Sequence, residues 1–132
     1  SPGGAVPGKR HAYALPARLG LNDWALAGDW TMTEQAVTLD EAGGRVACRF
    51  HARDLHLVMG PTAADSSVRF IVSVDGEPPG AAHGVDVDGS GNGTVTQQRL
   101  HQLIRQPGTV TDRTFEITFL DPGAQVYAFT FG

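Results

Sequence analysis

Basic and imidazole side chains alternate with apolar residues along two neighbouring runs within residues 45–61. In a β-strand successive side chains point to opposite faces, so these polar residues would share one face of a sheet. They are Arg49, His51 and His56, and Arg69 takes the same outward position in a later run. Guanidinium and imidazole groups donate hydrogen bonds to the hydroxyls of a ligand such as a sugar. We therefore take these four residues as candidate ligand-binding residues, with a plain solvated face as the alternative.

Aromatic side chains are the second group that could hold a sugar, because the flat apolar face of a pyranose fits an aromatic ring. The candidates are Tyr13, Trp24, Trp30 and Tyr127. Trp24 and Trp30 alternate in phase with Leu26, which favours a place in the core for both tryptophans. Trp30 is nevertheless kept as a fifth candidate ligand-binding residue.

Oxygen-bearing side chains recur at alternate positions of the segment 86–94, as in the first half of a calcium loop. They are Asp86, Asp88, Ser90 and Asn92. Calcium takes six to eight oxygen ligands and usually a bidentate acid at the twelfth position of such a loop, which here is Gln97. Asp and Asn side chains also bond their own backbone in ordinary turns. The segment is therefore predicted to be a glycine-rich connection, with calcium binding as an alternative.

The five histidines do not form a compact metal-binding motif. His51 and His56 are expected on adjacent strands as cross-strand neighbours, but a third ligand is missing. We expect the histidines to be solvated at the surface, and we expect neither a metal site nor a cofactor.

Catalytic constellations are equally absent from the sequence. Asp54, Asp75, Glu116 and Asp121 are expected at strand ends or in outward positions, where acids keep strands soluble. The chain has one cysteine and no C-x-x-C motif, so it cannot by itself perform dithiol exchange. Cys48 falls on the apolar face of its run and is expected to be a buried structural thiol. These observations predict a protein that is not an enzyme.

Charge and hydropathy exclude two further classes of partner. The net charge is −4 and Lys9 is the single lysine, which argues against nucleic-acid binding through phosphate contacts. No run of 18 apolar residues occurs, which argues against direct membrane insertion.

Short alternating runs separated by turn residues describe the rest of the chain. Strands are expected within 21–39 (two short ones), 45–50, 55–59, 68–74, 94–105, 115–119 and 127–131. Because no amphipathic helix is convincing, this pattern predicts an all-β fold, an antiparallel β-sandwich or jelly roll. Residues 1–10 are rich in glycine and proline and are interpreted as a flexible linker, with residues 11–132 as a single domain.

Several blocks of the sequence resemble the C-terminal module of the DipZ-type thioredoxin-like proteins of bacteria. They are Tyr13, the blocks 21–26 (LNDWAL), 28–30 (GDW), 42–45 (AGGR) and 49–55 (RFHARDL), the pairs 99–100 (RL) and 105–106 (RQ), and 129–132 (FTFG). The resemblance covers nearly everything from His11 onward. Cys48 and His101 depart from the family pattern, in which an aromatic is common at both positions, so we expect altered packing at the first and altered surface chemistry at the second.

This resemblance implies a β-sandwich similar to carbohydrate-binding modules, which follows an extracytoplasmic thioredoxin-like domain in proteins of the cytochrome c biogenesis type. It implies a non-catalytic accessory module in the periplasm or cell envelope, with a glycan and the thioredoxin-like domain of the same parent chain as possible partners. The alternative is a structural or protein-interaction module that packs on the thioredoxin-like domain and shapes client access. Calcium binding is the third hypothesis.

Overall fold

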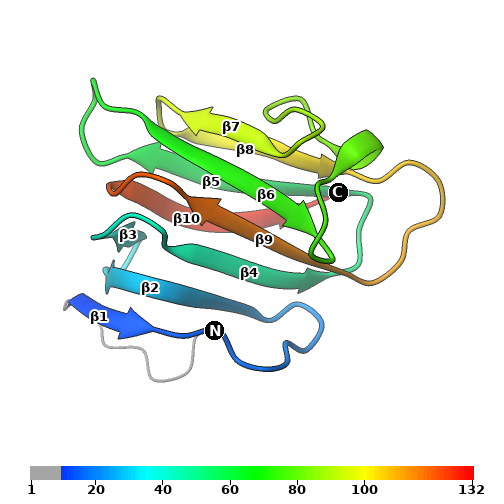
Figure 1. Ribbon diagram of the computed structural model, residues 1–132, viewed down its shortest axis with the longest axis horizontal. Coiled ribbons are helices and arrows are strands. Elements are labelled where there is room, and N and C mark those ends of the chain that lie inside the picture. Colours follow the sequence, from blue (N-terminus) through cyan, green and yellow to red (C-terminus); the bar gives the residue numbers. More distant parts are fainter. Residues whose placement is uncertain (1–9) are drawn as a thin grey trace.

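The computed structural model describes residues 10–132, which form ten β-strands and one short 3-10 helix (Figure 1). The strands are β1 (Arg10–Tyr13), β2 (Trp24–Met32), β3 (Val37–Leu39), β4 (Arg45–Phe50), β5 (Asp54–Pro61), β6 (Val68–Val74), β7 (Asn92–Val95), β8 (Arg99–Arg105), β9 (Arg113–Phe119) and β10 (Ala124–Phe131). The 3-10 helix η1 (Gly80–Ala82) lies between β6 and β7. No helix within these residues is long and apolar enough to cross a bilayer.

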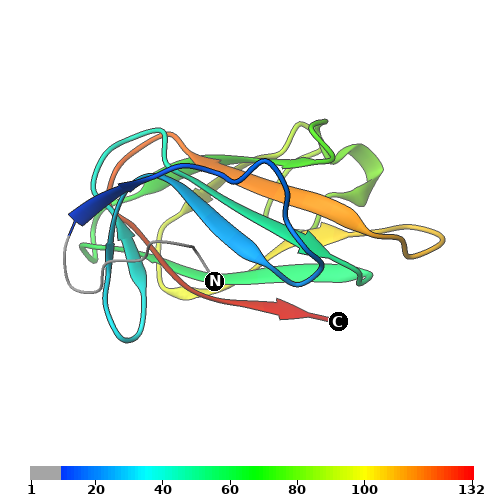
Figure 2. The same ribbon diagram turned by 90° about the horizontal axis from the view of Figure 1, so that it is seen from below.

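All strand pairs are antiparallel and follow one path, β7-β6-β9-β4-β2-β3-β10-β5-β8, with β1 added beside β2. This path folds over on itself into two layers, which Figure 2 shows from the side. The first half of β2 pairs with β4 in one layer, and its second half pairs with β3 in the other. The all-β antiparallel sandwich expected from the sequence is confirmed.

The core lies between the two layers and consists of the alternate apolar residues that the sequence pattern predicts. Val46, Cys48 and Phe50 point inward from β4, and Leu55, Leu57 and Met59 point inward from β5, all of them fully buried. Burial of a side chain of this size contributes roughly 1.5–3 kcal/mol relative to exposure. The apolar face of residues 45–61 is therefore one part of each sandwich wall.

β4 and β5 are not paired with each other, contrary to the expectation from the sequence. β4 pairs with β2 and β9, whereas β5 pairs with β10 and β8, so the connection between β4 and β5 passes from one layer to the other. The expectation that His51 and His56 are cross-strand neighbours is wrong, because the two strands face each other across the core instead of sharing hydrogen bonds.

The prediction of one strand over residues 94–105 is also wrong. They form two strands, β7 and β8, which belong to different layers, because β7 pairs with β6 and β8 with β5. Asp54, expected at a strand end or in an outward position, is the first residue of β5, but it is buried and accepts hydrogen bonds from Arg53 Nε and Nη2 at 3.2 and 2.9 Å. Residues 1–9 of the expected linker lie outside the described residues, and Arg10 already belongs to β1.

Candidate ligand-binding groove

The candidate residues on the layer that contains β4, β6 and β9 are each tied to a neighbour. Arg49 Nη1 donates to Thr114 Oγ1 at 2.9 Å, and His51 Nδ1 lies 2.7 Å from an Asp112 carboxylate oxygen. Arg69 forms a two-pronged ion pair with Asp121, with distances of 2.8 and 3.0 Å. The Arg69 guanidinium and backbone N–H hold the pKa of Asp121 low, at about 2.

Arg49 and Arg69 do not meet, because they lie beside opposite ends of β9. Arg49 pairs with Thr114, whereas the Arg69 carbonyl accepts a hydrogen bond from Leu120 N–H. Thr114 and Leu120 are six residues apart along an extended segment, which is roughly 20 Å. The two arginines therefore cannot hold one small ligand together.

The other two candidates lie elsewhere. His56 is half-buried on β5, in the opposite layer. Trp30 has 0% of its surface exposed, and its indole Nε1 donates to the Ala27 carbonyl at 2.9 Å. Trp30 is thus a core residue, as its alternation in phase with Leu26 predicts. A ligand cannot reach it. The five candidate residues do not form a common site.

His101 contradicts the expectation of solvated histidines, because it is only 1% exposed. It points inward from β8, and neither ring nitrogen has a hydrogen-bond partner within residues 10–132. Burial, followed by the charge of Arg99, lowers the pKa of the imidazole. The Asp86 carboxylate and the nearby backbone of Arg99 and Leu57 act in the opposite direction, but burial dominates.

The segment 86–94 has the hydrogen bonds of an ordinary turn. Asp88 Oδ1 accepts from the backbone N–H groups of Ser90 and Asn92, both at 3.0 Å. The two carboxylate oxygens of Asp86 accept from Arg99 Nη2 at 2.8 Å and from Gln102 N–H at 2.6 Å. Within the described residues no three His, Cys, Asp or Glu side chains are grouped so that they could hold a metal ion. These contacts support the prediction of a glycine-rich connection.

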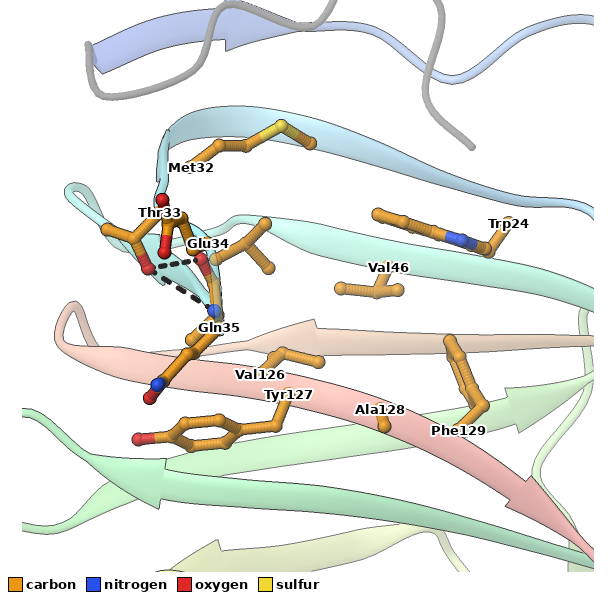
Figure 3. A pocket seen from close by; sticks show the side chains of 12 residues that line it. Trp24, Met32, Thr33, Glu34, Gln35, Val46, Val126, Tyr127, Ala128 and Phe129 are labelled. Atoms are coloured by element: carbon orange, nitrogen blue, oxygen red, sulfur yellow. Dashed lines mark hydrogen bonds between the residues drawn. The ribbon is translucent and has the colours of Figure 1, made fainter.

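A groove of about 260 Å³ opens between β10 and the connection from β2 to β3 (Figure 3). Its apolar lining comes from both layers: Trp24, Met32, Val37, Val46, Val126 and Phe129. Its polar rim consists of Thr33, Glu34, Gln35 and Tyr127. A concave apolar surface with a few polar groups at its border is the usual form of a small-ligand site.

The arrangement of the strands explains why the groove exists. β3 pairs with β10 only at Gln125 and Val126, and the first half of β2 leaves for the other layer, so the two layers part beside β10. A bulge between Val126 and Ala128 interrupts the register of β10 against β5. Such a bulge re-aims the extra side chain, here Tyr127, which then lies at the groove rim (Figure 3).

The Tyr127 hydroxyl lies between two amide oxygens, 3.1 Å from Gln98 Oε1 and 3.0 Å from Gln125 Oε1. A phenol carries one hydrogen and can donate it to only one of the two acceptors. The other amide oxygen is left to accept a hydrogen bond from an incoming hydroxyl. This cluster is uncharged, which suits a neutral polyol better than an ion.

The sequence pattern named two aromatic residues of this groove, Trp24 and Tyr127, as residues that could hold a sugar, but neither was kept among the candidate ligand-binding residues. It missed Phe129 and the turn at residues 33–36, in which Thr33 Oγ1 donates to the Ala36 carbonyl at 3.0 Å. The aromatic types were visible in the sequence. Their meeting depends on the short β3 and on the bulge in β10, neither of which has a clear sequence signal.

Comparison with known proteins now identifies the family. The model of the family described as "Thioredoxin like C-terminal domain" matches residues 1–132. The chain belongs to this family. It is 28% identical over 130 residues to Protein DipZ of Mycobacterium bovis and, at the same identity, to Protein DipZ of Mycobacterium tuberculosis. These matches include 98% of the chain but only 16% of the length of the relatives.

Two solved structures share the fold of this thioredoxin-like C-terminal domain. One is a family two carbohydrate esterase from Clostridium thermocellum in complex with cellohexaose, with a TM-score of 0.56 and 12% identity over 74% of this chain and 27% of that one. The other is a family two carbohydrate esterase from Cellvibrio japonicus, with a TM-score of 0.60 and 13% identity over 82% of this chain and 30% of that one. The likeness concerns the β-sandwich alone.

Proposed function

We propose that this chain is a non-catalytic accessory module of a larger thioredoxin-like protein and that it binds a glycan in the groove beside β10. The observation that carries the proposal is the groove itself, in which the rings of Trp24 and Phe129 border an apolar space and Tyr127, whose hydroxyl contacts the amide oxygens of Gln98 and Gln125, lies at the rim. Aromatic faces stack on sugar rings, and neutral amides bond sugar hydroxyls.

The family supports the accessory role. Its description, "Thioredoxin like C-terminal domain", is consistent with a module of a longer thioredoxin-like protein, and the chain spans 16% of the length of its DipZ relatives. We propose that the parent is an extracytoplasmic thiol-disulfide protein and that its thioredoxin-like domain carries the C-x-x-C chemistry that this chain lacks. The module would then bring that domain close to glycans of the cell envelope.

A glycan array followed by titration calorimetry tests the proposal. Cellohexaose is a suitable first probe, because a protein with this fold was solved in complex with it. We expect saturable binding in the millimolar range or tighter. Trp24→Ala and Tyr127→Phe should each weaken binding roughly tenfold, which corresponds to about 1.4 kcal/mol.

The matched control is Arg49→Ala, because the Arg49 side chain bonds Thr114 and is not part of the groove lining. Binding by this variant should equal that of the unsubstituted domain, and melting curves should establish that all three variants are folded. Absence of binding to every saccharide at millimolar concentration would refute the glycan proposal. A loss of binding in Arg49→Ala alone would move the site to the basic face.

A further inference from the structure

The last part of β10 is a strand edge that has no partner among residues 10–132. β3 pairs with β10 only at Gln125 and Val126, whereas β5 accompanies it as far as Phe131. The outer side of residues 128–131 therefore has no hydrogen-bonded neighbour within the described part of the chain. Figure 2 shows this end of β10 along the open side of the sandwich.

The register determines which backbone groups face outward. Gly132 and Asp54 exchange both backbone hydrogen bonds, at 3.3 Å each. Bonded and non-bonded pairs alternate along an antiparallel ladder, so Thr130 is bonded to His56, while Phe129 and Phe131 direct N–H and C=O away from β5. Free donors and acceptors at this spacing fit another extended strand.

The side chains of this edge are uncharged, and apart from Thr130 they are apolar. The rings of Phe129 and Phe131 are stacked with centroids 6.2 Å apart, and Phe131 also stacks on Phe50 at 6.1 Å. Phe131 nevertheless remains 43% exposed. Natural edge strands are usually protected from pairing by charges, proline or covering segments, and residues 127–131 (YAFTF) contain neither a charge nor a proline.

We propose that this edge pairs with the same edge of a second copy of the chain, antiparallel and with a two-fold axis at Thr130. In this register the partner's Phe131 lies opposite Phe129, and its ring lies on the inner side of the sheet, beside the Phe129 ring that borders the groove. The pairing ends at Ala128, before Val126, whose outer side is paired with Val37 of β3. The exposed Phe131 of each copy thus covers the Phe129 of the other, as a two-fold interface requires.

This proposal does not rest on glycan binding, and its test contains no saccharide. The interface joins two short strand edges and two rings, which is small for a protein complex, so a weak dimer in the micromolar range is expected. If both proposals hold, a glycan and the partner's Phe131 compete for the Phe129 ring.

Sedimentation equilibrium over a range of concentrations tests the dimer. As the concentration increases, the apparent mass of the unsubstituted domain should rise toward twice that of the monomer. Phe131→Lys should weaken association by roughly tenfold or more, because it places a charge at the centre of the interface. The matched control is Leu120→Lys, since Leu120 is 42% exposed but lies outside β10, and it should associate like the parent.

Amide hydrogen exchange gives a second readout that needs no substitution. The N–H groups of Phe129 and Phe131 should exchange fast in dilute solution and become protected at high concentration, where the dimer forms. The N–H group of Thr130 should be protected at low and at high concentration, because it is bonded to β5. A monomer at every concentration, or a dimer that Phe131→Lys does not weaken, would overturn the proposal and leave the edge to another occupant, such as an extended peptide.

Discussion

Two titratable side chains, Cys48 and His101, point into the core from opposite layers. Burial, with a smaller effect from the charge of Asp23, raises the pKa of the Cys48 thiol to about 11. The thiol therefore stays protonated and unreactive at neutral pH, as its position on the apolar face predicts. His101 is likewise uncharged at neutral pH, because burial lowers its pKa. Each group is tolerated in the core because it is neutral there.

The stability of the domain should depend on the protonation of His101. Because the pKa of its imidazole is lowered in the folded state, the unfolded chain binds the proton more readily, and stability falls as the pH drops below the ordinary histidine value of about 6.5. The aspartates whose pKa values are lowered, Asp75, Asp86, Asp88 and Asp121, reduce stability only below about pH 5. The loss between pH 7 and pH 5 is therefore expected to come largely from His101.

The substitution His101→Phe removes both the titration and the two unpartnered ring nitrogens. We expect it to stabilise the domain at pH 7 by about 1–3 kcal/mol and to flatten the pH dependence between pH 7 and pH 5. Urea unfolding at several pH values measures both effects. An unchanged slope in His101→Phe would contradict this assignment.

Among the strands, β2 differs from the others because it belongs to both layers. Gly28 lies between the half that pairs with β4 and the half that pairs with β3, and its φ of +103° is a conformation that other residues rarely adopt. A Cβ at this position would lie 2.8 Å from Gly44 Cα in the turn before β4. The change of layer thus requires a glycine for its backbone angle and for the close approach of a second segment.

Gly28→Ala should destabilise the domain by roughly 3 kcal/mol or more, because backbone strain and a backbone clash add together. Gly43→Ala is the matched control, since Gly43 has a similar φ of +89° but open space around its Cβ position. It should cost only the conformational part, roughly 1–2 kcal/mol. Thermal or urea unfolding compares the two variants, and equal losses would show that the approach to Gly44 is not critical.

At the scale of the whole molecule, the two layers share one core and cannot be separated along the chain. β5 pairs with β10, the last strand, and β4 pairs with β9, so each layer combines early and late segments. β2 connects both layers directly. A fold dominated by such distant pairings must close large loops before its contacts form, which slows folding.

We therefore expect one cooperative unfolding transition and refolding on a time scale of roughly milliseconds to seconds. Fluorescence of the buried Trp30, isolated in a Trp24→Phe variant, and far-UV circular dichroism should give coincident urea curves. Stopped-flow refolding should follow a single main phase. Two separated transitions would instead indicate that the layers unfold independently.

The sequence predicted the positions of the strands better than it predicted which strands pair. The runs at 45–50, 55–59 and 68–74 alternate so regularly that burial of their apolar faces could be predicted, although the second strand is longer in the structure, Asp54–Pro61. Residues 94–105 were harder, because two strands follow each other there with no strong breaker between them. For the candidate site, the basic residues were correctly placed outward, but their scatter over both layers depends on strand order.

The amino-acid sequence by itself determined the fold class, the buried face of each clear strand and the family, because alternation, turn chemistry and blocks that resemble a family pattern are local features. Only the tertiary structure decided which strands pair, that β4 and β5 face each other across the core, and that His101 is buried. It also decided where a ligand can enter. The groove and the free edge of β10 arise from a short β3, a bulge and a strand that changes layers, and these depend on pairing between residues that are distant in the chain.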